Sequence, residues 1–196
     1  FKLEWVSIYD FNCRRIDRFL HKRIIFVGDS AHVVSPFGAR GGNGGIHDID
    51  NLGWKLAAVI SRQANQDLLE SYNEERVFGA DENIRNSSWT SRFMSPDSDV
   101  EMAFRNAVLG LSVNAPFTRR LVNAGRLSLP CQLGHSSLTK NDTDDFDVQM
   151  TVGAPCLDAP LVTKNGDHAW LMNQLGNRFT LLVIGTPLCK APDDIH

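Results

Sequence analysis

An apolar run followed at once by a glycine-rich stretch constrains this chain more than any other feature. Residues 23–28 read Arg-Ile-Ile-Phe-Val-Gly, which predicts a strand buried on both faces, as in a parallel sheet. Residues 29–45 are expected to form a loop, and apolar residues at spacings of three and four then predict a helix from Ile46 to Arg62. Asp48 and Asp50 would lie in its first turn, where carboxylates favour the helix dipole. This order of elements indicates the α/β class.

Asp29 stands directly after the predicted strand, at the edge where open α/β sheets bind ligands. Its carboxylate can accept hydrogen bonds from a sugar-like diol, and the glycines after it let main chain approach a flat or anionic ligand. A P-loop is excluded because no Lys-Ser or Lys-Thr follows the glycines, and the G-x-G-x-x-G/A fingerprint does not follow this strand. On these grounds a glycine-rich turn that only joins strand to helix stays open.

A longer combination of residues over positions 28–57 is more specific. It consists of Gly28-Asp29-Ser30-Ala31-His32, then Pro36, Gly41-Gly42-Asn43-Gly44-Gly45, Asp50-Asn51-Leu52 and Trp54-Lys55-Leu56-Ala57. This combination resembles the second FAD-binding motif of the flavoprotein aromatic hydroxylases, the para-hydroxybenzoate hydroxylase-like group. A later stretch, Leu69-Glu70-Ser71-Tyr72, is similar to the family's helix after the flavin site. Arg119-Arg120-Leu121-Val122-Asn123 is similar to the branch that acts on phenols and 3-(3-hydroxyphenyl)propionate.

The resemblance implies a role for each residue of the motif. Gly28 and Asp29 would bind the cofactor, with Asp29 on the ribityl hydroxyls of FAD, and Pro36 would lie beside the isoalloxazine ring. The main chain of Gly41, Gly42, Asn43 and Gly44 would face the pyrimidine edge of the flavin. The helix after them would stabilise negative charge at the flavin N1–O2 locus, as its dipole also predicts. No catalytic residue is assigned, because those that activate the substrate are expected upstream of Phe1.

The resemblance also implies the reaction. An FAD- and NAD(P)H-dependent monooxygenase of this family hydroxylates a small phenolic or aromatic substrate with O2, through a flavin C4a-hydroperoxide. The chain would be a C-terminal portion that lacks the ADP-binding motif, so we expect it to bind FAD weakly and to be inactive alone. The alternative is a non-catalytic fragment or assembly module that keeps only helical and thioredoxin-like interaction surfaces.

We expect three regions along the chain. Residues 1–130 would complete a para-hydroxybenzoate hydroxylase-type FAD-binding fold, beginning with a strand that alternates Phe1, Leu3 and Trp5 and ending in a helical region over 65–130. The helices of that region are predicted at Asp67–Phe93, Val100–Ser112 and Pro116–Gly125. Residues 131–151 would be a solvated linker. Residues 152–196 would start a thioredoxin-like domain with a turn at Asn165-Gly166, a helix over Trp170–Leu175 and a strand over Phe179–Ile184.

Composition restricts the partners and the compartment. The 20 basic and 23 acidic residues leave a net charge of −3, which argues against nucleic-acid binding, and no apolar run is long enough for a membrane span. The four cysteines, Cys13, Cys131, Cys156 and Cys189, are scattered, which favours reduced thiols in the cytoplasm and no metal site. Because only Cys189 follows the last predicted strand, the C-terminal part is expected to serve structure or homo-oligomer contacts, not disulfide exchange.

Several polar residues near the motif receive plainer interpretations. His32 is expected to belong to the scaffold of the motif and not to act as a general base. Arg40 would either approach the flavin or be an exposed loop residue. Trp54 and Lys55 are interpreted as packing and surface residues, and His47 as solvated.

Overall fold

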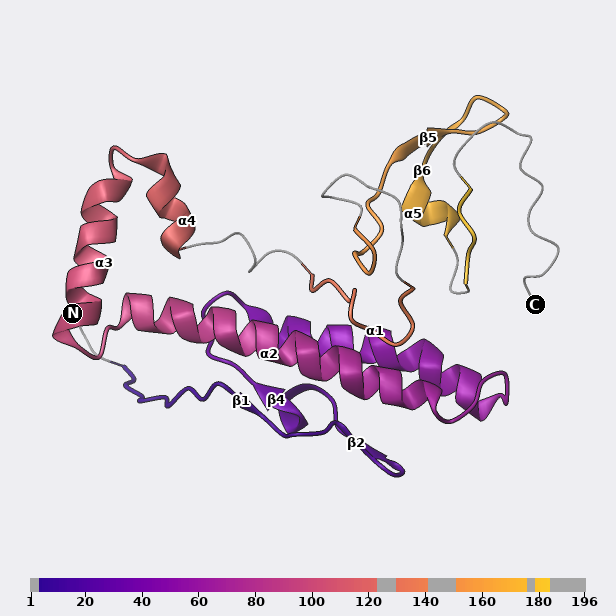
Figure 1. Cartoon of the computed structure of the whole chain (residues 1–196), viewed down its shortest axis with the longest axis horizontal. Coiled ribbons are helices and arrows are strands. Elements are labelled where there is room, and N and C mark those ends of the chain that lie inside the picture. The colour runs from indigo at the N-terminus through magenta and orange to yellow at the C-terminus, as the bar shows by residue number, and fades with distance from the viewer. Residues whose placement is uncertain (1–3, 123–129, 141–150, 176–178, 184–196) are drawn as a thin grey trace. The chain divides into compact units, whose positions relative to one another are not determined.

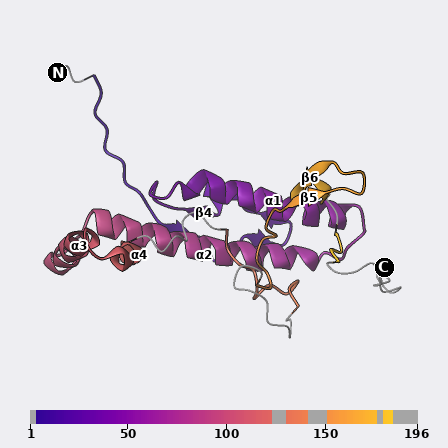
Figure 2. The same cartoon turned by 90° about the horizontal axis from the view of Figure 1, so that it is seen from above.

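Two long helices, α1 (Arg40–Ile60) and α2 (Leu68–Met94), run side by side in opposite directions (Figure 1, Figure 2). The computed structural model describes residues 4–122, 130–140, 151–175 and 179–183. By their contacts these residues form two units, 1–155 and 156–196, and both long helices belong to the first. Within the described residues no helix is both long enough and apolar enough to cross a membrane.

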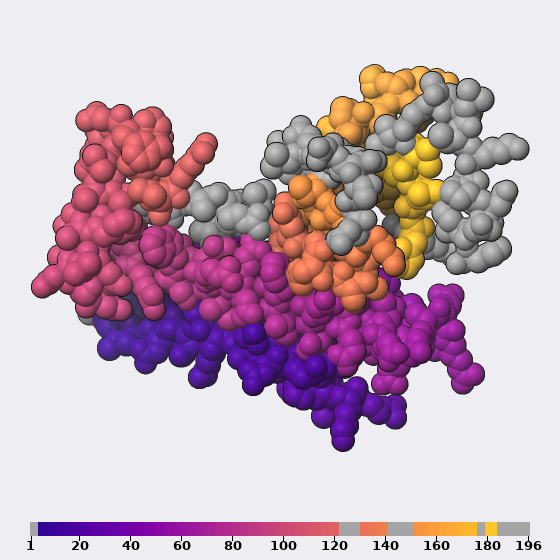
Figure 3. All heavy atoms as spheres, viewed as in Figure 1, coloured from indigo at the N-terminus to yellow at the C-terminus, as the bar shows by residue number. Residues whose placement is uncertain are grey.

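Short strands and one 3-10 turn lie along the helix pair. They are β1 (Arg14–Arg15), β2 (Leu20–His21), β3 (Ile24–Ile25), η1 (Gly28–Ser30) and β4 (His32–Val33). β1 pairs with β4 and β2 with β3, both antiparallel. Figure 3 shows this indigo segment lying along the magenta atoms of α2. The core lies between them, where Phe19 and Tyr72 are fully buried and the Tyr72 hydroxyl donates to the carbonyl of Phe26 at 2.7 Å.

The buried parallel strand expected over residues 23–28 is not formed. Ile24 and Ile25 pair only with the β2 residues of a tight hairpin, and the side chain of Ile24 is 61% exposed. The alternation at the N-terminus also gives no strand in residues 4–13. A strand needs a neighbour for its hydrogen bonds and a partner for its face, and in the described residues neither segment has both.

Helix α1 begins at Arg40, six residues earlier than the apolar periodicity predicts, so the glycine run is helical and not a loop. Asp48 and Asp50 therefore lie in the third turn. The glycines allow close approach between α1 and the loop before it: a Cβ on Gly44 would lie 2.9 Å from Cε1 of His32, and one on Gly45 would lie 3.4 Å from Cα of Gly28. Tertiary packing thus outweighs the low helix propensity of glycine here.

The predicted helical region is confirmed where the structure describes it. α2 continues through Gly79, and α3 (Asp99–Ser112) begins after Ser98, whose side chain accepts from the N–H of Glu101 as an N-cap. η2 (Pro116–Thr118) and α4 (Arg119–Val122) form the start of the helix predicted from Pro116. Its expected end at Gly125 falls outside the described residues.

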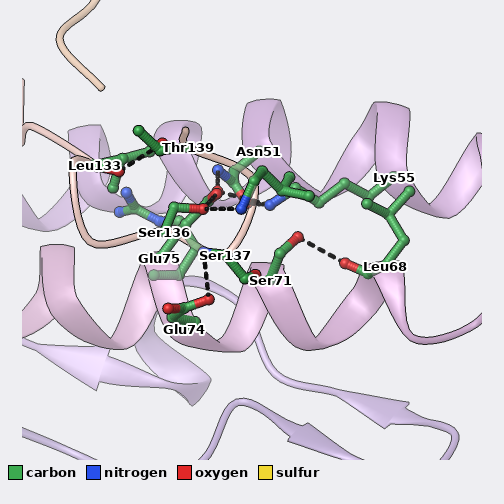
Figure 4. A network of polar contacts seen from close by, with 12 residues as sticks. Asn51, Lys55, Leu68, Ser71, Glu74, Glu75, Leu133, Ser136, Ser137 and Thr139 are labelled. Carbon is green, nitrogen blue, oxygen red and sulfur yellow. Dashed lines mark hydrogen bonds and ion pairs between the residues drawn. The ribbon is translucent and has the colours of Figure 1, made fainter. Parts of the chain in front are cut away.

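Lys55 is fully buried, which corrects its interpretation as a surface residue. Its ammonium donates to the Glu75 carboxylate of α2 at 2.6 Å and to Oδ1 of Asn51 at 2.9 Å (Figure 4). Burial lowers the pKa of Lys55, and Glu75 opposes that effect. Burial alone would raise the pKa of Glu75, but hydrogen bonds from Lys55, Ser136 and Asn51 lower it below its ordinary value.

The segment 130–140 is attached to this network. Ser136 is buried and donates to the second oxygen of Glu75, and the Ser137 N–H donates to Glu74 at 3.1 Å (Figure 4). We expected a solvated linker over residues 131–151. The first part of it is instead held against α2, because Glu75 needs a further donor once it leaves water.

The second unit contains a hairpin, β5 (Pro160–Val162) and β6 (His168–Trp170), followed by α5 (Leu171–Gln174). The predicted turn at Asn165-Gly166 is confirmed, with Gly166 at φ 88° joining the two strands. The short helix predicted over Trp170–Leu175 is also confirmed. Residues 179–183, where we expected a strand, form none and are exposed, and Cys189 falls outside the described residues.

We expect Glu75→Gln to lower the free energy of unfolding of this chain by about 3–5 kcal/mol, because it leaves the buried Lys55 ammonium without its counter-charge. Urea unfolding followed by circular dichroism measures the change. The matched control is Glu70→Gln on the same helix, whose partner Arg18 lies 2.7 Å away in an exposed pair. It should cost less than about 1 kcal/mol. Equal losses in the two variants would contradict the assigned role.

Candidate functional site

A hollow of about 340 Å³ lies where β1, β4 and the start of α1 meet. Asp29, Gly41 and Gly42 line it, so the structure brings three of the predicted cofactor residues together. Phe11, Val33 and Val34 give it apolar walls, and Asp10, Asn12 and Arg14 complete its lining. A planar ring with polar edges fits the apolar part of such a lining.

A second hollow, of about 300 Å³, lies beside the first. The two share Arg14, Asp29 and Val33, so Asp29 stands at their junction. The residues that line only the second hollow are Arg15, Ile16, Ser30, Ala31 and His32. An extended ligand could lie along both hollows and pass Asp29 between them.

The residues present fit a flavin cofactor on one direct test. An added Cβ at Gly41 or Gly42 would meet no atom within 4 Å, so the main chain there is open to a ligand. These residues also lie in the first turn of α1, whose N–H groups favour negative charge. Main-chain donors without covering side chains suit the polar edge of a flat ring.

The other predicted residues do not line the hollows. Pro36 is exposed in the loop before α1, and Asn43 is exposed with its amide donating to the carbonyl of Ala39 at 2.7 Å. Gly44 is buried against His32, while Gly28 lies against Gly45. The cofactor contacts expected of these four residues stay predictions.

The carboxylate of Asp48, on α1, joins several segments through hydrogen bonds that the sequence does not predict. It is fully buried and accepts three hydrogen bonds: from the N–H of Gly28 at 2.8 Å, from Nε2 of His32 at 2.8 Å and from Nε of Arg76 at 2.7 Å. Since the carboxylate can only accept, Nε2 of His32 carries the proton in this contact. Burial alone would raise the pKa of Asp48, but His32, Arg76 and Gly28 lower it. His32 is thus a scaffold residue, and Asp29 is held next to a fixed Gly28.

A serine cluster holds the loop that carries Pro36. Oγ of Ser35 lies 2.6 Å from Oγ of Ser87 and 2.8 Å from Oγ of Ser91, both on α2. The Ser87 hydroxyl also lies 3.2 Å from the carbonyl of Phe37. The position of Pro36 is therefore set by α2, more than fifty residues away in sequence.

Two residues of α1 differ from their predicted surroundings. Arg40 is buried and not an exposed loop residue, and it donates to Oδ1 of Asn83 at 3.2 Å. His47 is half-buried, and burial lowers its pKa, with Arg76 and Arg40 adding to the effect. Both follow from the early start of α1, which turns these side chains toward α2.

Comparison with known proteins supports a flavin site. Residues 1–87 match the family model described as an FAD binding domain. A flavin-dependent monooxygenase from Mycobacteroides abscessus is 51% identical over 75 residues, which are 38% of this chain and 16% of that protein. A 3-(3-hydroxy-phenyl)propionate/3-hydroxycinnamic acid hydroxylase from Escherichia coli is 28% identical over 189 residues, 95% of this chain and 33% of that protein.

Solved structures agree with these relatives. The OxyS anhydrotetracycline hydroxylase from Streptomyces rimosus superposes with a TM-score of 0.62 and 28% identity, over 81% of this chain and 30% of that chain. The chain therefore resembles FAD-dependent hydroxylases in sequence and in fold. It spans a third or less of the length of these curated relatives.

We expect Asp48→Asn to lower the free energy of unfolding at pH 7 by about 3–5 kcal/mol, since it removes the charge that pairs with buried Arg76. Because the folded pKa of Asp48 lies below its unfolded value of about 3.9, its contribution is present above that pH. It is lost as the pH falls through the lower, folded pKa. The difference in urea midpoint between Asp48→Asn and the unmutated chain should therefore become smaller in strong acid. The control, Asp50→Asn at an exposed position, should have the same urea midpoint as the unmutated chain at each pH. A difference between Asp48→Asn and the unmutated chain that stays constant at all pH values would contradict the role assigned to Asp48.

Proposed function

We propose, from the premise that residues 1–87 carry an FAD binding domain, that this chain is the C-terminal part of an FAD- and NAD(P)H-dependent monooxygenase. Its substrate would be a small phenolic or aromatic compound. The observation that carries the proposal is the meeting of Asp29, Gly41 and Gly42 in one hollow at the start of α1. The names of the relatives, which include hydroxylases of hydroxyphenyl acids, support this substrate class.

The residues of this chain would bind and orient the cofactor. Asp29 accepts hydrogen bonds from the ribityl hydroxyls, and the open main chain of Gly41 and Gly42 faces the polar edge of the ring. The positive end of α1 stabilises negative charge that develops on that edge. Pro36, held by the serine cluster, borders the ring, and Asn43 and Gly44 extend the same edge. When bound, the flavin supplies the redox and oxygen chemistry.

The second unit has a separate proposed role. We propose that residues 152–196, which include this unit, start a thioredoxin-like domain that contributes to structure or to contacts between subunits. Trp170 and Phe179 are 52% and 91% exposed, which supports a partner surface. The three described cysteines, Cys13, Cys131 and Cys156, are free, in keeping with a reducing, cytoplasmic compartment.

The first test uses the full-length protein that contains this chain. It should copurify yellow with a flavin absorbance band, and it should oxidise NAD(P)H faster when a phenol is added. Absorbance spectra and NAD(P)H consumption measure the two effects. A colourless protein that cannot be reconstituted with FAD would refute the proposal of an FAD-dependent enzyme and support a non-catalytic assembly module.

The second test concerns Asp29. In the full-length protein, Asp29→Ala should raise the dissociation constant for FAD by about 10- to 100-fold, because hydrogen bonds to a charged group are worth about 1.5–3 kcal/mol. The fold should be unchanged, since the side chain is exposed. Asp17→Ala is the control: it removes an exposed carboxylate of the same segment that lines neither hollow. Unchanged FAD affinity in Asp29→Ala would remove its assigned role.

A further inference from the structure

We propose that Arg14 is a cofactor-binding residue whose guanidinium holds a phosphate group of a dinucleotide beside Asp29. This inference rests on the proposed function. Arg14 lines both hollows, and so does Asp29. The two residues therefore place a cation and a carboxylate at the point where an extended ligand would pass from one hollow into the other.

The neighbouring arginine, Arg15, has a partner within the fold, and Arg14 differs from it in this respect. Arg15 uses its guanidinium fork on Asp81 of α2, with Nε to Oδ1 at 2.7 Å and Nη2 to Oδ2 at 2.8 Å. Successive residues of a strand point to opposite sides, so β1 directs Arg15 to the helix and Arg14 away from it. Arg14 is exposed, and no side-chain hydrogen bond or ion pair joins it to another described residue. The guanidinium group of Arg14 is therefore available to a ligand.

The charges around the hollows place an anion at Arg14. The first hollow contains two carboxylates, Asp10 and Asp29, and Arg14 is the only cationic side chain in its lining. In the second hollow, Asp81 already neutralises Arg15. Apart from the N–H groups at the start of α1, which the proposed function assigns to the edge of the ring, a phosphate away from Arg14 would meet the carboxylates of Asp10 and Asp29 or an arginine already paired with Asp81.

The kinds of residue in the lining match the kinds of group in a flavin dinucleotide. The apolar walls Phe11, Val33 and Val34 suit a ring, Asp29 suits the hydroxylated chain, and Arg14 suits a phosphate. Arginine pairs with phosphate through two parallel N–H···O bonds, a geometry that lysine lacks. The phosphate could belong to FAD or to NAD(P)H, because both are dinucleotides with the same pyrophosphate.

The test compares Arg14→Gln, Arg14→Lys and the unmutated full-length flavoprotein. Apoprotein is titrated with FAD and, separately, with riboflavin, which has no phosphate, and the KM for NAD(P)H and for the aromatic substrate is measured. Arg23→Gln is the matched control, since it removes an exposed positive charge of the same segment outside both hollows. We expect Arg14→Gln to raise the dissociation constant for FAD by about tenfold or more and to leave the dissociation constant for riboflavin unchanged. Arg14→Lys should fall between, and it serves as the test should Arg14→Gln fail to fold.

The measurements distinguish whether the phosphate belongs to FAD or to NAD(P)H. They also distinguish a failure of the Arg14 inference from a failure of the proposed function. Weaker binding of FAD with unchanged binding of riboflavin assigns the phosphate to FAD. A raised KM for NAD(P)H with unchanged FAD affinity assigns the phosphate to the reductant. Equal weakening of FAD and riboflavin, a raised KM for the aromatic substrate alone, or no change relative to Arg23→Gln overturns the inference while the proposed function stands. An unmutated protein that binds no flavin overturns both.

Discussion

The buried carboxylate of Asp48 is the contact on which the rest of the first unit depends. A charge removed from water is costly unless its oxygens are paired, and here the partners come from the loop at Gly28 and His32 and from Arg76 of α2. One side chain of α1 therefore joins the loop, its own helix and the next helix. Asp29 follows Gly28 directly, so the residue proposed to meet the cofactor is presented from a fixed backbone.

A second buried pair runs between the same helices with the opposite polarity. α1 contributes the anion in Asp48–Arg76 and the cation in Lys55–Glu75. Because Glu75 and Arg76 are consecutive, a shift of one helix along the other would separate both charged pairs. The register of the two helices thus has an electrostatic component in addition to the apolar core around Tyr72. That register in turn sets the serine cluster at Ser35 and the loop that carries Pro36.

The sequence predicts the long helices well and the site partially. The start and stop signals of the sequence locate α2 and α3, although the buried residues of α2 are largely polar, among them Glu75, Arg76 and Asn83. The family motif brings out Asp29, Gly41 and Gly42, which the structure then places in one hollow. The motif does not distinguish Gly44, which packs on His32, from Gly42, which is open, since both are glycines in the same run. Arg14 gave no signal in sequence, because only the fold separates it from Arg15.

The sequence by itself determined the identity of the motif, the helical region and the type of cofactor, since each depends on a local pattern of residue types. Only the tertiary structure decided where α1 begins, that Lys55 and Asp48 are buried, and which arginine of β1 is left for a ligand. The physical reason is the same in each case. Glycine in a helix, a buried lysine and a buried aspartate are unfavourable locally, and they become stable through partners that lie about 12 to 28 residues away along the chain.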